Sequence, residues 1–297
     1  MTTLSERILG APEGSYVDCQ VDRAYVHDGT GVLALEAWNA MQARMLARND
    51  RCYVLFDHIV PANNSVTAGL QAELRRFARE QGLPFTDVGE GVCHQVMGEG
   101  IALPGEVVVG ADSHTCTLGA FGAFATGVGA TDMAAIWADG GTWFRVPESI
   151  GVFLSGSLAG PAEAKDLALT YVSRLSMDGA TYKALEFVGD GVSSLSMDSR
   201  MTLSNLAVET GAKAGLFYAD KETCAYLREF GHSAGLQVPG ECRYERTLDI
   251  DMADVVPVVA VPPRVDTVRP VEDVAGIPLD QVFLGTCTNG RYADLER

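Results

Sequence analysis

The sequence lacks long hydrophobic runs and is poor in positive charge. No stretch approaches the roughly 20 continuous apolar residues of a membrane helix, and the first residues do not have the basic-then-apolar order of a secretory signal. Lysine and arginine total 22 against 39 aspartate and glutamate, which gives a net charge of −17. A charge of that sign repels nucleic acids and anionic membrane surfaces. We therefore expect a cytoplasmic protein that binds neither nucleic acid nor membrane.

Several common motifs are also missing. No GxGxxG follows an early strand with an acidic residue about 20 positions later, and there is no Walker phosphate loop, so a dinucleotide-binding fold is disfavoured. The seven cysteines are odd in number and scattered, and none forms a CxxC. This is unlike the disulfide framework of a small secreted domain. We expect reduced thiols, with one metal ligand among them.

The pattern that is present favours an α/β fold. The chain has 297 residues, of which 47% are hydrophobic, enough for about two domains. Short β-rich runs, at 52–56 and 106–110, alternate with longer helical stretches, which predicts parallel sheets covered by helices. Apolar residues at helical spacing predict an amphipathic helix over 65–81 that ends at Gly82. Its expected apolar face consists of Val66, Leu70, Leu74 and Phe77.

Changes of pattern along the chain predict three segments. A helix over 130–144 is expected to end before Pro147, where a strand beginning SIGVFL opens a second βα series. A proline-containing stretch over 261–274 has no helical period and is predicted to be an interdomain linker. After it, QVFLG predicts a strand, followed by a turn with Cys287 and the start of a helix. The expected domains are 1–147, 148–262 and, as a linker with the start of a third domain, 263–297.

Four of the five histidines lie at or beside predicted strand-to-loop transitions. The carboxyl ends of parallel strands converge on one crevice, so Asp57-His58 and Asp112-Ser113-His114 can face a common ligand. A carboxylate that holds an imidazole raises its basicity, which suits proton transfer to a substrate hydroxyl. The alternative is that each aspartate caps a helix beside an unrelated histidine. Two such pairs, together with His94, favour an acid–base site.

Cys287 lies in a predicted strand-to-helix turn, where exposed amides and the helix dipole favour a thiolate. It can therefore be a nucleophile, a metal ligand or simply a small buried apolar residue. The glycine-rich stretch over 110–130 permits a close approach of backbone to a bound anion.

Five motifs, taken in order, resemble the aconitase superfamily along nearly the whole chain. They are FDHIVPANN, GVCHQVMGEG, GADSHTCTLGAFGAFATGVGATDMA, RMTLSNLAVETGAKAG and GTCTN. Two further motifs, VHDGTG and TWFRVPESI, are most similar to the branch of 3-isopropylmalate dehydratase large subunits and archaeal-type homoaconitases. The resemblance implies aconitase-like three-layer αβα domains with mainly parallel sheets.

The resemblance also implies roles for individual residues. His58 becomes the acid that protonates the departing hydroxyl, while Ser113 and His27 bind substrate. Asn205 lies close to the cluster and the substrate, and Cys287 is the first of three cysteine ligands of a [4Fe–4S] cluster. The expected catalytic pairs are Asp57 with His58, Asp112 with His94, and Glu209 with His114.

The branch places its swivelling domain and a catalytic serine on a separate small subunit, and its other two cluster cysteines in a CxxC that this sequence does not contain. We expect the sequence to be a truncated or proteolysed piece ending at Arg297. We expect this chain by itself to hold no intact cluster and to be inactive.

The resemblance implies an iron–sulfur hydro-lyase for a small hydroxy-di- or tricarboxylate. The first expectation is isomerisation of 2- and 3-isopropylmalate by dehydration and rehydration in leucine biosynthesis. Homoaconitase and methylmalate or citraconate hydro-lyase are alternatives. Two other classes stay open: a metal-independent lyase or hydrolase with Cys287 or Ser113 as nucleophile, and an inactive binding or assembly module.

Overall fold

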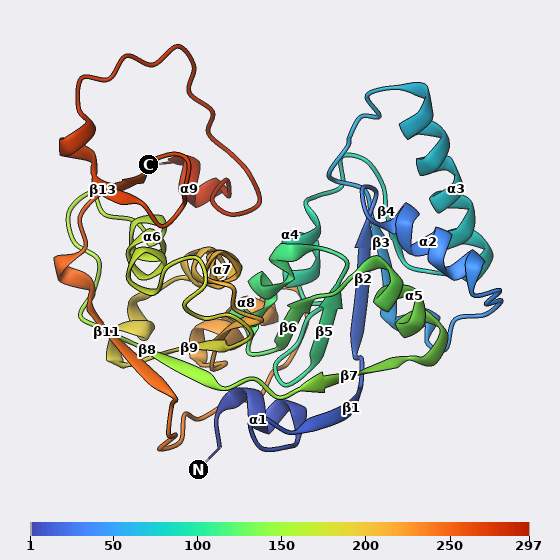
Figure 1. Cartoon of the computed structure of the whole chain (residues 1–297), viewed down its shortest axis with the longest axis horizontal. Helices are drawn as coiled ribbons and strands as arrows, with labels where there is room; N and C mark the ends of the chain where they lie inside the picture. The colour runs from blue at the N-terminus through green and yellow to red at the C-terminus, as the bar shows by residue number, and fades with distance from the viewer. Residues whose placement is uncertain (1, 297) are drawn as a thin grey trace.

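The computed structural model describes residues 2–296, and its N-terminal half is built on a five-stranded parallel sheet (Figure 1). Successive residues of a strand point to opposite faces. Ala24 and Val26 accordingly belong to one hydrophobic cluster and Tyr25 to another, so both faces are buried. The strands, in spatial order, are β4 (Phe85–Thr86), β3 (Cys52–Leu55), β2 (Arg23–His27), β5 (Val107–Gly110) and β6 (Phe124–Gly127).

Helices cover both faces of this sheet (Figure 1). On one face the rings of Trp38, Phe77 and Trp137 pack together with centroids 5.2–6.1 Å apart. On the other face Met97 and Phe121 are fully buried. The predicted three-layer αβα arrangement with mainly parallel sheets is confirmed. The covering helices are α2 (Gly31–Ala40), α3 (Ser65–Gln81) and α5 (Ala130–Asp139) on the first face and α4 (Cys93–Gly98) on the second.

The predicted helix over 65–81 is confirmed, but its buried face is only partly the expected one. The side chain of Asn64 caps α3 by accepting from Thr67 N at 2.9 Å, and Gly82 ends the helix with φ +67°. Leu74 is buried, whereas Val66 is 70% exposed and Leu70 37% exposed. The first two turns carry no buried residue, because α3 reaches the core only from Gln71 onward.

A second parallel sheet forms most of the other half. Ile150, Val152 and Leu154 point from its third strand into a cluster with helices α6 and α7. Ala184 and Val188 point the opposite way and join the first cluster. The strands, in spatial order, are β10 (Ala214–Phe217), β9 (Ala184–Val188), β8 (Ser149–Ser155) and β11 (Arg246–Asp251), and the helices are α6 (Ala164–Leu175), α7 (Met197–Leu206) and α8 (Lys221–Glu229).

The two halves share core residues. Met201 of α7 lies in the same hydrophobic cluster as Phe121 of the first half. Because the halves share a core, their packing does not mark domain boundaries, and the division into 1–147, 148–262 and 263–297 stays a prediction. None of the helices described between residues 2 and 296 is long and apolar enough to cross a bilayer.

The expected helix over 130–144 is wrong in its second part. Helix α5 ends at Asp139, because Gly140 adopts the left-handed conformation with φ +75°. Residues 141–145 instead form strand β7 (Gly141–Arg145), which pairs antiparallel with β1 (Tyr16–Gln20). Trp143 and Phe144 suit a strand better than a helix, since aromatic side chains pack well on a pleated surface.

The C-terminal stretch differs from its prediction in two places. The expected linker contributes to an antiparallel pair, β12 (Val258–Ala260) with β13 (Val268–Pro270), and Val258 N donates to Asp166 Oδ1 of α6 at 2.8 Å. The strand predicted at QVFLG is not formed. Phe283 and Leu284 are each 77% exposed, with no strand beside them in the described part of the chain to satisfy their backbone groups.

The remaining described helices are short. Helix α1 (Leu4–Leu9) lies near the N-terminus, and α9 (Tyr292–Glu296) is the helix expected after Cys287. Arg297, the predicted end of the third segment, lies outside the described residues.

Candidate active site

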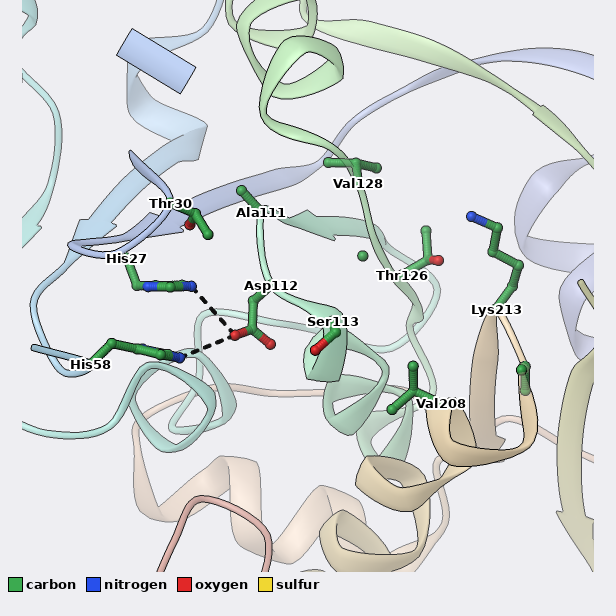
Figure 2. Close-up of a pocket in the computed structure, with 13 residues that line it drawn as sticks. His27, Thr30, His58, Ala111, Asp112, Ser113, Thr126, Val128, Val208 and Lys213 are labelled. Carbon is green, nitrogen blue, oxygen red and sulfur yellow. Dashed lines mark ion pairs between the residues drawn. The ribbon is translucent and has the colours of Figure 1, made fainter. Parts of the chain in front are cut away.

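The strands of the first sheet end at one edge, and the predicted site residues follow them. Strand β2 ends at His27, while β3 and β5 lead into the loops at 56–59 and 111–114. Because parallel strands present their carboxyl ends together, these loops meet. A cavity of about 580 Å³ opens here, and Figure 2 shows His58 and Asp112 along one side of it.

Asp112 is the centre of the arrangement. Its Oδ2 lies 3.3 Å from His58 Nε2 and 3.5 Å from His27 Nε2. Its Oδ1 lies 3.3 Å from His94 Nε2 and accepts from the backbone N–H of His114 at 2.7 Å. Burial opposes ionisation of this carboxyl, but the hydrogen bonds from His58 and His94 hold the pKa of Asp112 well below its usual range. One ionised carboxylate thus orients three imidazoles.

His58 is held between two carboxylates. Besides Asp112, its Nδ1 lies 2.7 Å from Asp57 Oδ1, and Asp57 Oδ2 accepts from Cys93 N at 2.6 Å. Hydrogen bonds with Asp112 and Asp57 raise the pKa of His58 to about 10. His58 is therefore an imidazolium at neutral pH, and its side chain is 39% exposed to the cavity and solvent.

His27 has the opposite protonation state. Its ring stacks on that of His58 with centroids 3.5 Å apart and planes 13° from parallel. Burial, followed by repulsion from His58, lowers the pKa of His27 to about 4. Since like charges oppose each other at this distance, only one ring of the stack is charged at neutral pH.

His94 links the Asp112 cluster to Cys287. The ring is buried, and its Nδ1 lies 3.2 Å from the hydroxyl of Tyr25. Burial opposes its protonation, but hydrogen bonds with Asp112 and Cys287 raise the pKa of His94 to about 9. The same contact lowers the pKa of the half-buried Cys287 thiol. Cys287 is therefore a thiolate candidate that faces an imidazolium.

His114 pairs with a residue from the second half of the chain. Its Nε2 lies 3.4 Å from Oε1 of Glu209, and Ser113 Oγ lies 3.1 Å from its Nδ1. The pair raises the pKa of His114 and lowers that of Glu209. The side-chain pairing of Asp112 with His114 suggested by their tripeptide is not formed, because the imidazole turns toward Glu209. The site is thus assembled from both halves.

Asn205 anchors the turn that carries Cys287. It is fully buried in α7, where its Nδ2 donates to Thr117 Oγ1 at 2.8 Å and its Oδ1 accepts from Thr288 Oγ1 at 2.7 Å. Arg291 donates to the carbonyl oxygens of Thr288 and Cys287 at 3.0 and 3.3 Å. Side chains from two segments therefore hold Cys287 and the residue that follows it.

The structure brings together all three carboxylate–histidine pairs that the sequence predicted, but Asp28 was missed. One oxygen of this buried carboxylate accepts from Asp57 N and His58 N at 3.1 and 2.9 Å. The other accepts from Ile59 N and Gln71 Nε2 at 2.9 and 3.0 Å. Asp28 therefore fixes the loop that carries Asp57 and His58. The available signal was an aspartate directly after the end of a strand, in VHDGTG.

The ligand atoms of His27, Asp28, Asp57 and His58 lie within 4.8 Å of one another, as metal ligands do. Their hydrogen bonds argue against that use. Four N–H groups already occupy the two oxygens of Asp28, and Nδ1 of His58 faces Asp57. We interpret this group as a positioning network for His58.

The surroundings of Cys287 suit one corner of an iron–sulfur cluster, since thiolates hold such clusters. Two other cysteines of this region, Cys93 and Cys116, are fully buried, and burial raises the pKa of both thiols. Among the cysteines of this region in residues 2–296, Cys287 is therefore better suited than Cys93 or Cys116 to bind a cluster as a thiolate.

A parallel α/β scaffold that presents three imidazole–carboxylate pairs beside Cys287 is suited to acid–base chemistry and offers one thiol to a metal group. The chain belongs to the aconitase family: the family's model, described as aconitase family (aconitate hydratase), matches residues 4–297. The family resemblance found in the sequence is confirmed. Complete enzymes of this family are hydro-lyases that contain a [4Fe–4S] cluster.

Three named relatives show which members of the family the chain is similar to. The chain is 49% identical over 280 residues to the probable methanogen homoaconitase large subunit of Methanosarcina mazei, covering 93% of this chain and 72% of the relative. It is 45% identical over 304 residues to 3-isopropylmalate dehydratase large subunit 1 of Methanopyrus kandleri, covering 99% and 73%. It is 41% identical over 302 residues to the 3-isopropylmalate dehydratase large subunit of Elusimicrobium minutum, covering 99% and 72%. Each of these relatives is named a large subunit.

Proposed function

We propose that this chain is the large subunit of an iron–sulfur hydro-lyase that interconverts 2- and 3-isopropylmalate by dehydration and rehydration. The observation that carries the proposal is the Asp112-centred cluster, which keeps His58 protonated at the mouth of a cavity and His94 beside Cys287. Relatives named 3-isopropylmalate dehydratase large subunit support this choice of substrate.

His58 is the proposed general acid. In dehydration, a base removes the proton on the carbon next to the hydroxyl-bearing carbon, and the C–H electron pair forms the double bond. The C–O bond breaks, and the departing hydroxyl takes a proton from His58 and leaves as water. Asp57 and Asp112 hold His58 in its charged form and fix both ring nitrogens. In rehydration the proton returns to His58 from water.

The other predicted residues position the reactants in this proposal. His94 with Asp112 and His114 with Glu209 orient groups at the reacting carbon, while Ser113 and neutral His27 contact a substrate carboxylate and hydroxyl. Cys287 would hold one corner of the [4Fe–4S] cluster, near Asn205. When bound, the cluster supplies a Lewis-acidic iron that makes the hydroxyl a better leaving group.

The base that removes the carbon-bound proton is proposed to be a serine on a small subunit that carries the swivelling domain. The large-subunit names of the relatives support the existence of such a partner. Among residues 2–296, the polar groups that line the cavity near His58 are an ionised Asp112, a neutral His27 and the hydroxyls of Thr30 and Ser113, and the hydroxyl of Ser113 bonds to His114.

A second candidate is homoaconitase, because a relative of that name is 49% identical over 93% of the chain. The two candidates share the proposed acid–base residues and differ in substrate. A homoaconitase acts on a tricarboxylate, whereas 3-isopropylmalate carries two carboxylates and an isopropyl group.

The test is turnover by the assembled enzyme, with the small subunit bound and the cluster loaded, on 3-isopropylmalate and on homocitrate. We expect the ultraviolet absorption of the unsaturated acid to rise with 3-isopropylmalate. His58→Gln should lower kcat by roughly 10²- to 10⁴-fold, the usual contribution of a general acid.

The matched control is His232→Gln, since His232 is the histidine outside the cluster, and it should keep wild-type kcat. Turnover of homocitrate alone would select the second candidate. Full activity of His58→Gln would contradict the role of His58, and an assembled enzyme inactive on every substrate would favour a binding or assembly module.

A further inference from the structure

A lysine lies across the cavity from the histidine cluster. Figure 2 shows Lys213 on the side opposite His27 and His58, with Asp112 and Ser113 between. The residues that line the cavity on the lysine side are otherwise uncharged, including Thr126, Gly211 and Ala212. Lys213 is thus the one primary amine that lines this cavity in the described part of the chain.

The lysine is anchored, and no close ion pair neutralises its ammonium group. Its backbone N–H donates to the carbonyl oxygen of Lys183 at 2.8 Å, just before β10, which fixes the origin of its side chain. Between residues 2 and 296, no carboxylate lies within 4.0 Å of its Nζ; the ring of Tyr182 lies 5.2 Å away, and Asp132 acts on the charge only from beyond ion-pair distance. Burial lowers the pKa of Lys213, because half-burial of a cation without a close counter-ion is unfavourable unless a ligand supplies one.

The charges around the cavity indicate what the ammonium group of Lys213 can bind. The chain carries a net charge of −17, Asp112 lines the cavity next to the histidines, and Asp57 pairs with His58. A dianionic ligand therefore needs local positive charge at both ends. The protonated His58 supplies it at one end, and Lys213 supplies it at the other.

We propose that Lys213 binds the carboxylate of the substrate that is remote from His58, so that the cavity selects dicarboxylates over monocarboxylates. This assignment rests on the proposed function for the identity of the substrate. A purely structural role, in which Lys213 only packs on Tyr182, predicts no dependence of ligand affinity on its charge.

The experiment compares the binding of two unreactive probes, succinate and butyrate, to the assembled enzyme by titration calorimetry. Succinate has two carboxylates and butyrate has one. In Lys213→Met we expect the Kd of succinate to rise roughly 10- to 100-fold, the effect of one charge-assisted hydrogen bond. The Kd of butyrate should change by less than about threefold, and Lys213→Arg should restore most of the succinate affinity.

Lys221→Met is the control, because it removes one positive charge from an exposed position outside the cavity. It should leave both Kd values at the wild-type level. An unchanged succinate Kd in Lys213→Met would overturn the assignment. An equal loss for both probes, or failure of Lys213→Arg to recover affinity, would also overturn it.

The result is separable from the proposed function, because binding is measured without turnover. An enzyme that prefers succinate through Lys213 but does not dehydrate 3-isopropylmalate would refute the proposed function alone. An enzyme that dehydrates 3-isopropylmalate but binds succinate equally well without the Lys213 amine would refute this inference alone.

Discussion

Replacement of Asp28 by asparagine should destabilise the protein and misplace His58. The carboxylate accepts four N–H groups at 2.9–3.1 Å, three of them from the consecutive residues 57, 58 and 59. The amide of asparagine is isosteric but replaces one acceptor oxygen by an NH₂ group. Two N–H donors in buried or partly buried positions would then face a third donor.

The size of the effect follows from those two lost bonds. Each buried donor left without an acceptor costs roughly 1–3 kcal/mol, so Asp28→Asn should lower the free energy of unfolding by about 4 kcal/mol. At roughly 2–4 °C per kcal/mol for a chain somewhat smaller than this one, Tm should fall by about 10 °C. The loop of His58 should also shift, so kcat should fall more than KM changes.

Denaturant unfolding and initial-rate kinetics on the assembled enzyme test this reasoning together. Asp249→Asn is the matched control, since Asp249 is exposed on β11 and its side chain makes no hydrogen bond or ion pair with residues 2–296. It removes the same charge and should leave stability within about 0.5 kcal/mol. An equally small change for Asp28→Asn would refute the argument that Asp28 holds the loop.

Three further predictions concern other groups. Burial raises the pKa of Glu186, which accepts from the N–H groups of Leu4 and Ser5. The folded state therefore binds that proton more tightly than the unfolded state, and its contribution to stability falls as pH rises from about 4.5 through the folded pKa. Glu186→Gln should flatten this slope in urea unfolding, and an unchanged slope would contradict the assignment. The pKa of His58 is raised to about 10, so its contribution is complete below about 6.5 and is lost as pH rises toward 10. An imidazole NMR titration of His58 that turns near its ordinary pKa would count against the two-carboxylate clamp. Arg291→Met removes the donor to the carbonyls of Cys287 and Thr288 and should speed alkylation of Cys287 by about tenfold, for a local loss of about 1–2 kcal/mol. Peptide mass spectrometry measures it with Cys242 as internal reference, and equal labelling in both proteins would show that Arg291 does not hold the turn.

The parts of the fold that the sequence predicts are those with local signals. Gly82 marks the end of α3, and the short β-rich runs at 52–56 and 106–110 mark β3 and β5. The start of β7 after Gly140 was missed, because the strand depends on its distant partner β1. The apolar run near Phe283 gave a strand signal, but a strand needs a neighbour that no local pattern reveals.

The site residues likewise divide into those with a local sequence signal and those without one. The Asp57–His58 pair is readable from a dipeptide at a strand end. The contacts of Asp112 with His27 and His58 were not predicted, since they join three different loops. Glu209 entered only through the family resemblance, because its partner His114 lies on the other half of the chain. The catalytic roles of these residues stay predictions, and His58→Gln tests that of His58.

The stacked rings of His27 and His58 have a consequence for regulation by acidity. The pKa of His27 is about 4 and that of His58 is about 10. Between these limits His58 alone of the two is an imidazolium, so this end of the cavity carries one fixed positive charge. Ordinary changes in cellular pH leave that charge untouched. Any acid or alkaline limb in the activity of the assembled enzyme near neutrality must therefore arise from other groups, such as the base proposed for a small subunit or the substrate itself.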